Sequence, residues 1–403
     1  MKTQKINFTN REGQELAARL EFPVDQQPHH FAVFAHCFTC SKNLNAVRNI
    51  SNGLTRNGFA VLRFDFTGLG ESEGDFADTN FSSNVNDLVD AAGYLAEHYQ
   101  APVLLVGHSL GGSAVLLASK YLESVKAVTT IGAPFEPEHV KHLLQDSVET
   151  IERKGTATVS IGGRPFEIKK QFLDDIKSVK LSKQLAELRK ALLIMHSPQD
   201  TTVGIDNAAQ IYQAAKHPKS FITLDGADHL LSKKEDSFYA GQMIGNWAQR
   251  YIQIPKRDAL KSQNQVAVRT GESGFTTEIK AGVHQLVADE PESVGGNDYG
   301  PNPYDYLVAG LGACTSMTLR MYADRKRWDV KEIKVHLDHQ KIHCEDCEQN
   351  ENRSSKIDFI ERSIELEGEL SDEQRQRLLE IADKCPVHRT LHSQIKVKTI
   401  LVE

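Results

Sequence analysis

The chain has 403 residues, of which 40% are hydrophobic and 25% charged, and its formal net charge is −7. This length exceeds that of one ordinary domain, so we expect two. The acidic balance argues against nucleic acid and anionic membranes as partners. No stretch approaches the roughly 18 apolar residues of a membrane span, and the start of the chain lacks the apolar core of a signal peptide. We therefore expect a cytoplasmic protein whose 6 cysteines are reduced.

Apolar strand-like runs alternate with helix-like segments through residues 1–255. The expected strands are 6–8, 31–35, 60–64, 103–106, 127–131, 192–195 and 221–224, and the expected helices are 45–57, 81–99 (opened by Ser82-Ser83) and 237–251. Uniformly apolar strands separated by helices indicate a parallel sheet covered on both faces. The sequence therefore predicts an α/β sandwich with a mostly parallel sheet.

The segment Gly107-His108-Ser109-Leu110-Gly111 directly follows the apolar run 103–106. A buried strand that leads into G-x-S-x-G and then into a helix is typical of a nucleophile elbow. The glycines leave room for a tight turn that lifts the serine hydroxyl out of the sheet, above a helix N-terminus. Ser109 is therefore the candidate nucleophile.

A serine hydroxyl is a weak nucleophile at neutral pH and needs a base, which an acid must orient. Asp200 and His229 each follow an expected strand, so both should lie at the sheet edge where Ser109 emerges. The order serine, acid, histidine is the one that a nucleophile elbow of this kind requires. Asp228 is the alternative acid, but adjacent side chains rarely reach each other, which favours a surface or capping role for it.

The strand–helix alternation breaks between Pro134 and Lys190. Two helical segments there flank an expected hairpin, 157–161 and 164–168, which turns at Gly162-Gly163. An insertion between sheet strands near the nucleophile predicts a lid over a pocket. The alternative is an added edge structure with no role in binding.

These motifs make residues 1–255 resemble the α/β-hydrolase family. The family's His-Gly motif corresponds to His36-Cys37, and Phe64–Gly70 matches its D-x-x-G-x-G turn. The resemblance implies that the domain cleaves a small carboxylic ester, or a related acyl bond, without a cofactor. It also implies that the N–H groups of Phe38 and Leu110 bind the oxyanion.

Cys37 replaces the glycine that the family usually has, so the donor of the second N–H group stays open. The spacing Cys37-x-x-Cys40 has two interpretations. The pair is either a redox switch that controls the pocket or two small apolar side chains that pack in the core.

A polar stretch with a helix breaker, Ile254–Asp258, marks the boundary between the domains, and we assign residues 256–262 to a linker. Residues 263–403 have the pattern of an α+β domain. The expected elements are strand-like segments, a long helix from Pro303, strands 333–337 and 357–366, a helix that begins at Ser371 with a capping box to Gln374, and a last strand 395–401.

Two cysteines fall on the helices of this second domain. Helical spacing places Cys314 in an apolar seam with Leu307, Leu311, Thr318 and Met321. Cys385 ends the helix that begins at Ser371, because Pro386 stops it. Without further context, both thiols could simply pack as small hydrophobes.

Asn302-Pro303 leading to Gly312-Ala313-Cys314, and later Cys385-Pro386, resembles the OsmC-like family, which includes the organic hydroperoxide resistance proteins. The resemblance covers residues 263–403 and implies an intertwined homodimer. It also implies that the Cys314 thiolate attacks an organic hydroperoxide and that Cys385 resolves the sulfenic acid as a disulfide, which a thiol reductant must then reduce.

Peroxidatic thiolates need electropositive help, for which this family uses an arginine held by a glutamate. Tyr304 stands where that glutamate is expected, with Asp305 adjacent, and Arg269 is a candidate arginine. Thiol peroxidase could be the main activity of the protein. The alternative is that the domain keeps the fold only for dimerisation or ligand binding.

Cys344-Glu-Asp-Cys347, preceded by His339 and His343, has the spacing of half a zinc site. The same domain contains no second C-x-x-C, and the surrounding loop is acidic and polar. Exposed thiols on a hairpin loop are therefore the favoured interpretation, and we expect no metal.

Overall fold

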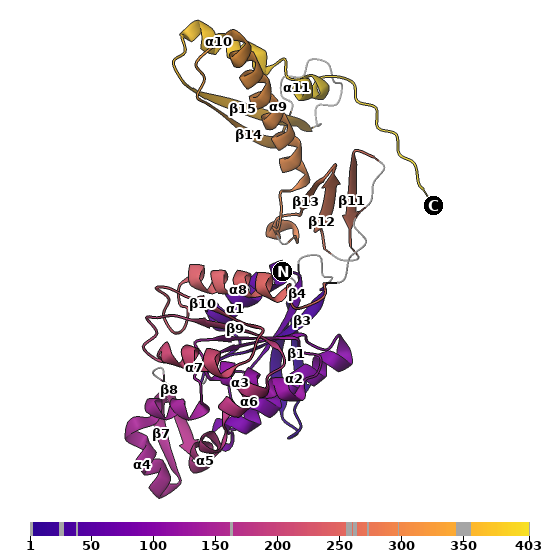
Figure 1. Cartoon of the computed structure of the whole chain (residues 1–403). Coiled ribbons are helices and arrows are strands. Elements are labelled where there is room, and N and C mark those ends of the chain that lie inside the picture. Colours follow the sequence, from indigo (N-terminus) through magenta and orange to yellow (C-terminus); the bar gives the residue numbers. More distant parts are fainter. Residues whose placement is uncertain are drawn as a thin grey trace. The chain divides into compact units, whose positions relative to one another are not determined.

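The computed structural model describes residues 3–23, 28–37, 39–161, 164–254, 260, 264–271, 274–296, 298–343 and 356–402. The chain divides into two compact units, Met1–Ala259 and Leu260–Glu403, called here the N-terminal and C-terminal units (Figure 1). The division falls within the stretch 256–262, most of which lies outside the described residues. In the described part of the chain, no helix has both the length and the hydropathy needed to cross a bilayer.

Eight described strands of the N-terminal unit form one sheet in the order β1-β2-β4-β3-β5-β6-β9-β10. The pairs β1–β2 and β2–β4 are antiparallel, and every later pair is parallel. The bounds are β1 Thr3–Thr9, β2 Glu15–Glu21, β3 His30–Ala35, β4 Phe59–Phe64, β5 Leu104–His108, β6 Ala127–Ile131, β9 Ala191–His196 and β10 Lys219–Thr223. The mostly parallel sheet confirms the predicted architecture.

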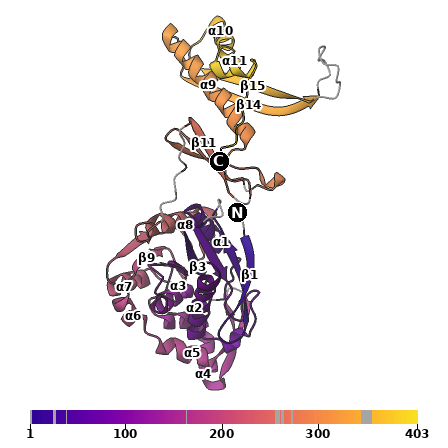
Figure 2. The ribbon, with the colours of Figure 1, turned by 90° about the vertical axis from the view of Figure 1, so that its right-hand side faces the viewer.

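Helices cover both faces of this sheet (Figures 1 and 2). They are α1 Asn45–Arg56 and α8 Lys234–Ala248 on one face, and α2 Phe81–His98, α3 Leu110–Ala118 and α7 Asp206–Ala214 on the other, with short 3-10 helices at Phe76–Asp78 and Ser119–Tyr121. Successive strand residues point to opposite faces, so Val33 packs with α2 and α3 while Phe34 packs with α1 and α8. The helix α2 begins at Phe81, as predicted, but Asn80 and not Ser82-Ser83 caps it, in a capping box with Ser83.

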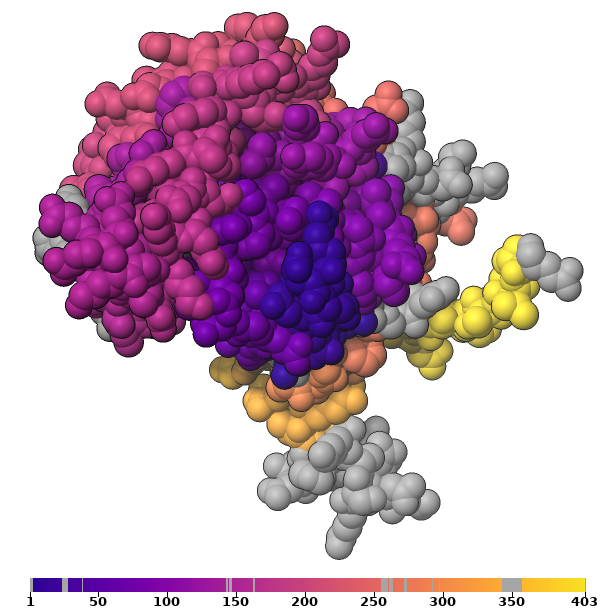
Figure 3. All heavy atoms as spheres, turned by 90° about the horizontal axis from the view of Figure 1, so that it is seen from below, coloured from indigo at the N-terminus to yellow at the C-terminus, as the bar shows by residue number. Residues whose placement is uncertain are grey.

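The insertion lies between β6 and β9, as predicted. Its elements are a 3-10 helix Pro137–Leu144, α4 Gln145–Lys154, β7 Thr156–Ile161, β8 Arg164–Lys169, α5 Lys170–Ser178 and α6 Leu181–Glu187. Val159, Ile168 and Phe172 belong to the same buried cluster as α2 and α3. Figure 3 shows the magenta atoms of this segment gathered on one side of the unit. The hairpin turn Gly162-Gly163 lies outside the described residues.

The C-terminal unit is α+β. Its elements are the antiparallel strands β11 Val266–Thr270, β12 Thr277–Ala281 and β13 His284–Ala288, a 3-10 helix Glu292–Val294, α9 Pro303–Lys326, the hairpin β14 Glu332–His343 and β15 Lys356–Glu367, α10 Asp372–Ala382 and α11 Pro386–Leu391. Leu319, Ala323 and Leu378 are the centre of a small core between α9 and α10. The predicted capping box of α10 is present, since Ser371 accepts the N–H of Gln374.

The bounds of two expected elements in this unit are wrong. The strand expected at 395–401 does not form, because residues 394–402 have no ladder partner among the described residues. Cys385 does not end the helix that begins after Ser371; that helix ends at Ala382, and Cys385 caps the next helix, α11. Pro386 begins this helix because its missing N–H is not needed at the first helical position.

Candidate active site

Ser109 lies in the turn between β5 and α3, as the elbow motif predicts. Its φ of 56° and ψ of −126° are unusual for a residue with a side chain. A Cβ at Gly107 would lie 2.3 Å from the carbonyl oxygen of Gly111, and a Cβ at Gly111 would lie 2.4 Å from that of His36. Both glycines are therefore required by close backbone approach. The turn leaves Ser109 half-buried.

Three side chains from separate loops form a hydrogen-bonded chain. Ser109 Oγ lies 3.0 Å from His229 Nε2, and His229 Nδ1 lies 2.6 Å from Asp200 Oδ2. Asp200 follows β9 and His229 follows β10, so the carboxyl ends of neighbouring parallel strands bring them together. This is the geometry in which a histidine can take a proton from a serine while a carboxylate fixes its tautomer.

Asp200 is held as a carboxylate. Burial would raise its pKa, but the hydrogen bond from His229 and those from the N–H groups of Val203 and Thr202 outweigh burial and lower the pKa. The ionised form is therefore available to orient His229. The neighbouring Asp228 does not share this role, since its carboxylate accepts the N–H of Ser232.

Two buried histidines, to which the sequence pattern gave no role, support the hydrogen bonds between Ser109, His229 and Asp200. His108 Nε2 lies 2.7 Å from the carbonyl oxygen of His229, and His196 Nε2 lies 2.7 Å from that of Val203. Burial, followed by the nearby His229, lowers the pKa of His108 to about 3, and burial also lowers the pKa of His196. Both rings are therefore neutral near pH 7 and can each donate to these carbonyls, which holds the backbone of the His229 and Asp200 loops.

The expected oxyanion donors are only partly described. The N–H of Leu110 is at the N-terminus of α3, directly after Ser109. Phe38 lies outside the described residues. Leu110, Gly111 and Cys37 line one small cavity, with room for about one water molecule. The loop after β3 therefore approaches the elbow where the oxyanion is expected.

Cys37 and Cys40 are joined by a disulfide. The expectation that all cysteines are reduced is therefore wrong for this pair. The first and last residues of a C-x-x-C turn approach closely enough for a bond, and the Cα atoms are 5.3 Å apart. Whether the bond forms depends on this local geometry as well as on the compartment.

Cys314 and Cys385 are free thiols in the C-terminal unit, half-buried and buried respectively. The structure links the Cys385 loop to α9, because Thr315 Oγ1 lies 3.6 Å from Cys385 Sγ. Arg362, on β15, donates to Thr315 Oγ1 at 3.0 Å and forms an ion pair with Asp383 at 2.7 Å. No local sequence pattern predicts the role of Arg362, since only the β14–β15 pairing and its packing on α9 reveal its position.

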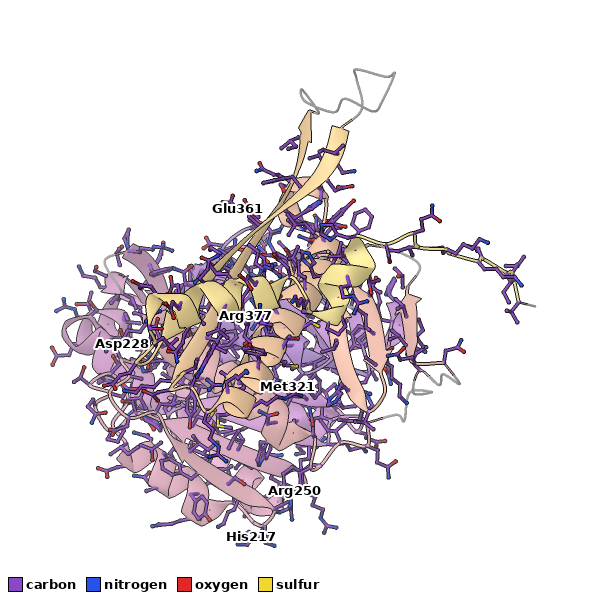
Figure 4. All side chains as sticks on the ribbon, turned by 90° about the horizontal axis from the view of Figure 1, so that it is seen from above. His217, Asp228, Arg250, Met321, Glu361 and Arg377 are labelled. Atoms are coloured by element: carbon purple, nitrogen blue, oxygen red, sulfur yellow. A yellow bond between two sulfur atoms is a disulfide. The ribbon has the colours of Figure 1, made fainter. Side chains whose placement is uncertain are left out.

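The buried face of α9 differs from the predicted seam. Leu311, Thr315 and Leu319 are buried, whereas Leu307 is 42% and Met321 is 66% exposed. Figure 4 labels Met321 on this helix. Helical spacing fixes which residues share a face, but the contact with β14 decides which face is covered.

The two groups proposed to activate the thiolate have other partners. Arg269 forms an ion pair with Glu278 at 2.6 Å, and Asp305 Oδ2 accepts the N–H of Asn302 in the cap of α9. Neither contact involves a cysteine. The ring of Tyr304 stacks on His339, with ring centroids 4.3 Å apart.

Cys344 and Cys347 lie outside the described residues. In the ranges that the structure describes, no three histidine, cysteine, aspartate or glutamate side chains are arranged to hold a metal ion.

Comparison with known proteins separates the same two units. Residues 26–159 match the model of the family described as "Serine aminopeptidase, S33", and residues 295–400 match that of the family described as "OsmC-like protein". The crystal structure of the esterase domain of a Rhodothermus marinus protein is 51% identical over 62% of this chain and 99% of that one, with a TM-score of 0.53.

More distant relatives support the fold alone. The mouse protein "Alpha/beta hydrolase domain-containing protein 10" is 21% identical over 61% of this chain and 99% of that one, with a TM-score of 0.53. A Salmonella typhi protein, "Uncharacterized protein YfhR", is 23% identical over 60% of this chain and 80% of its own length. The 51% identity to the Rhodothermus marinus esterase domain and the family match of residues 26–159 show that the chain belongs to the α/β-hydrolase family through its N-terminal unit. Its C-terminal unit contains an OsmC-like domain.

Proposed function

We propose that the N-terminal unit hydrolyses small carboxylic esters through an acyl-serine intermediate. The observation that carries this proposal is the hydrogen-bonded chain from Ser109 through His229 to Asp200. The 51% identity to the Rhodothermus marinus esterase domain favours esters over other acyl compounds.

In the first half-reaction, Ser109 Oγ attacks the ester carbonyl carbon while His229 Nε2 takes the hydroxyl proton. The N–H of Leu110 then donates to the developing oxyanion, together with a second N–H from the loop after β3, which the family resemblance assigns to Phe38. Collapse of the tetrahedral intermediate breaks the ester C–O bond, and His229 returns the proton to the leaving alcohol. Water repeats these steps on the acyl-serine and releases the acid.

A fluorophosphonate probe tests this proposal directly. We expect it to label the wild-type protein and to inactivate hydrolysis of p-nitrophenyl acetate, and we expect Ser109→Ala to abolish both. Ser124→Ala is the matched control, because it also removes a serine hydroxyl, but one that donates to the carbonyl oxygen of Pro102 and not to His229. An unlabelled wild-type protein, or a labelled Ser109→Ala variant, would contradict the proposal.

For the C-terminal unit we propose a homodimer. Large apolar side chains are exposed on the β11–β13 sheet and its turns, on α9 and in the final segment. Among them are Val268, Val283, Met317, Met321, Val397 and Leu401. Residues 394–402 offer backbone groups without a ladder partner among the described residues. A second copy of this unit could cover these surfaces.

We also propose that this unit reduces organic hydroperoxides. The Cys314 thiolate would attack the peroxide, so that the O–O bond breaks, an alcohol leaves and a sulfenic acid forms. Cys385 then condenses with it, releasing water, and a dithiol reduces the resulting disulfide. The contact that links α9 to Cys385 through Thr315 supports this pairing.

Consumption of cumene hydroperoxide in the presence of a dithiol tests the peroxidase. We expect Cys314→Ser to abolish it, whereas Ser109→Ala should leave the rate unchanged. Wild-type protein that consumes no hydroperoxide would leave dimerisation or ligand binding as the role of this unit.

A further inference from the structure

The loop between β3 and α1 contains the Cys37–Cys40 disulfide and faces the nucleophile elbow. We propose that this disulfide is a redox modification site, at which a dithiol switches the rate of the hydrolase. The inference rests on the proposed ester hydrolysis, because the loop acts on the oxyanion site.

The position of Cys37 ties the disulfide to that site. Cys37 is 3% exposed and lines the same cavity as Leu110 and Gly111. Leu110 is the expected oxyanion donor from the elbow. A change in the backbone at Cys37 therefore occurs beside the groups that must stabilise the oxyanion.

The disulfide holds a turn that the backbone alone disfavours. Thr39, between the two cysteines, has a φ of +63°, in the left-handed region. As a β-branched residue, threonine prefers extended backbone. The N–H of Cys40 donates to the carbonyl oxygen of Cys37 at 3.1 Å and completes the turn. Breaking the S–S bond removes the covalent closure of this turn and allows Thr39 to relax toward extended values.

The far end of the loop is anchored without the sulfurs. Lys42 is 1% exposed; its N–H donates to Asp65 Oδ1 at 2.6 Å and its Nζ forms an ion pair with Asp65 Oδ2 at 2.5 Å. Arg63 donates to the carbonyl oxygen of Lys42. At the near end, the carbonyl oxygen of His36 lies against Gly111. Reduction should therefore loosen the short segment between these anchors and leave the domain folded.

The two sulfurs differ in their access to a reductant. Cys40 is partly exposed, whereas Cys37 is buried. A thiolate of the reductant attacks Cys40 Sγ, the S–S bond breaks, and Cys37 leaves as a thiolate and takes up a proton. The second thiol of the reductant then displaces Cys40 and closes the reductant's own disulfide. Two electrons pass from the dithiol to the protein, and oxidation by a small disulfide reverses the exchange.

The experiment uses the full chain with Cys314, Cys344, Cys347 and Cys385 replaced by serine, so that only the Cys37–Cys40 pair responds. The protein is equilibrated at set ratios of reduced to oxidised dithiothreitol. Hydrolysis of p-nitrophenyl acetate gives kcat and KM, and alkylation followed by peptide mass spectrometry gives the reduced fraction of the pair.

We expect kcat to fall about tenfold or more on reduction, with KM within about twofold, because the oxyanion site acts on the transition state. The loss of activity should follow the reduced fraction and reverse on oxidation. Cys40→Ser should have the low kcat under every condition and should not respond to dithiothreitol.

Unchanged kcat in protein whose Cys37 and Cys40 are alkylated would overturn the inference. A pair that is already reduced in oxidising buffer, or that dithiothreitol never reduces, would overturn it as well. Failure of the proposed function looks different: the oxidised protein would then neither hydrolyse the ester nor react with the fluorophosphonate.

Discussion

The two units differ in how completely a single chain buries their strands and brings their candidate site residues together. In the N-terminal unit the central strands β3, β4, β5, β6 and β9 are buried on both faces. Three loops at one sheet edge bring Ser109, Asp200 and His229 together. In the C-terminal unit the strands β11–β13 are half-covered at best, with Ala288 as the only buried residue among them. The role of a side chain can be assigned from one chain only where the same chain also supplies the residues that contact and bury that side chain.

Of the changes considered in this comparison, removing the charge of Asp200 should have the largest effect on the site of the N-terminal unit. Asp200→Asn keeps the shape of the side chain but removes its charge, so His229 loses the partner that fixes its tautomer. We expect kcat for ester hydrolysis to fall about 10⁴-fold. Steady-state kinetics measures this loss.

Asp228→Asn is the matched control, because Asp228 is adjacent to His229 but bonds to Ser232. It should keep kcat within about threefold. Equal losses in the two variants would show that Asp200 is not the orienting acid.

The homodimer proposed for the C-terminal unit is tested by adding charge to the exposed face of α9. Met317 and Met321 lie one turn apart on that face, and carboxylates placed there would have to be desolvated in a dimer. We expect the double variant Met317→Glu/Met321→Glu to weaken dimerisation at least about 100-fold. Analytical ultracentrifugation measures the dissociation constant.

The control for this variant is Tyr121→Glu, which adds charge at a 60% exposed residue of the N-terminal unit. It should dimerise as the wild type does. A wild-type protein that remains monomeric at high concentration would refute the homodimer.

The smallest expected effect comes from the buried His108, which should change how the free energy of unfolding depends on pH. The folded-state pKa of His108 is about 3, below the unfolded value of about 6.5. Between these values the unfolded chain binds more protons, so stability that is fully present above pH 6.5 is lost as the pH falls. Each such group contributes a slope of about 1.4 kcal/mol per pH unit.

His108→Gln keeps a donor for the carbonyl of His229 and removes the titrating ring. Between pH 6.5 and 4.5, we expect the slope of unfolding free energy against pH to decrease by about 1.4 kcal/mol per pH unit, which corresponds to the uptake of one proton fewer on unfolding. Urea unfolding in a Trp328→Phe background measures it, since Trp247 then reports on the N-terminal unit. The same slope in both proteins would mean that His108 is protonated in the folded state.

The sequence located the features that depend on local pattern. The elbow around Ser109, the cap at Ser371 and the strands from 31–35 to 221–224 all follow from short-range spacing of apolar residues, glycines and polar caps. Loops at the carboxyl ends of parallel strands meet at one edge, which also located Asp200 and His229.

Other features required contacts between distant segments. The ion pair of Lys42 with Asp65 and the bridge from Arg362 to Thr315 join residues 23 and 47 positions apart, and no local pattern encodes them. The covered face of α9 was predicted wrongly for the same reason, since β14 selects it.

By itself, the sequence determined that the chain contains an α/β set and an α+β set of helices and strands, and an elbow that presents Ser109. Backbone preference and hydrophobic periodicity, which act over a few residues, are sufficient for this. Only the tertiary structure decided that Cys37 and Cys40 are bonded, that His108 is neutral and holds the backbone of His229, and that the strand expected at 395–401 has no partner within the described chain. Bond formation, burial and strand pairing all depend on which groups approach one another in space.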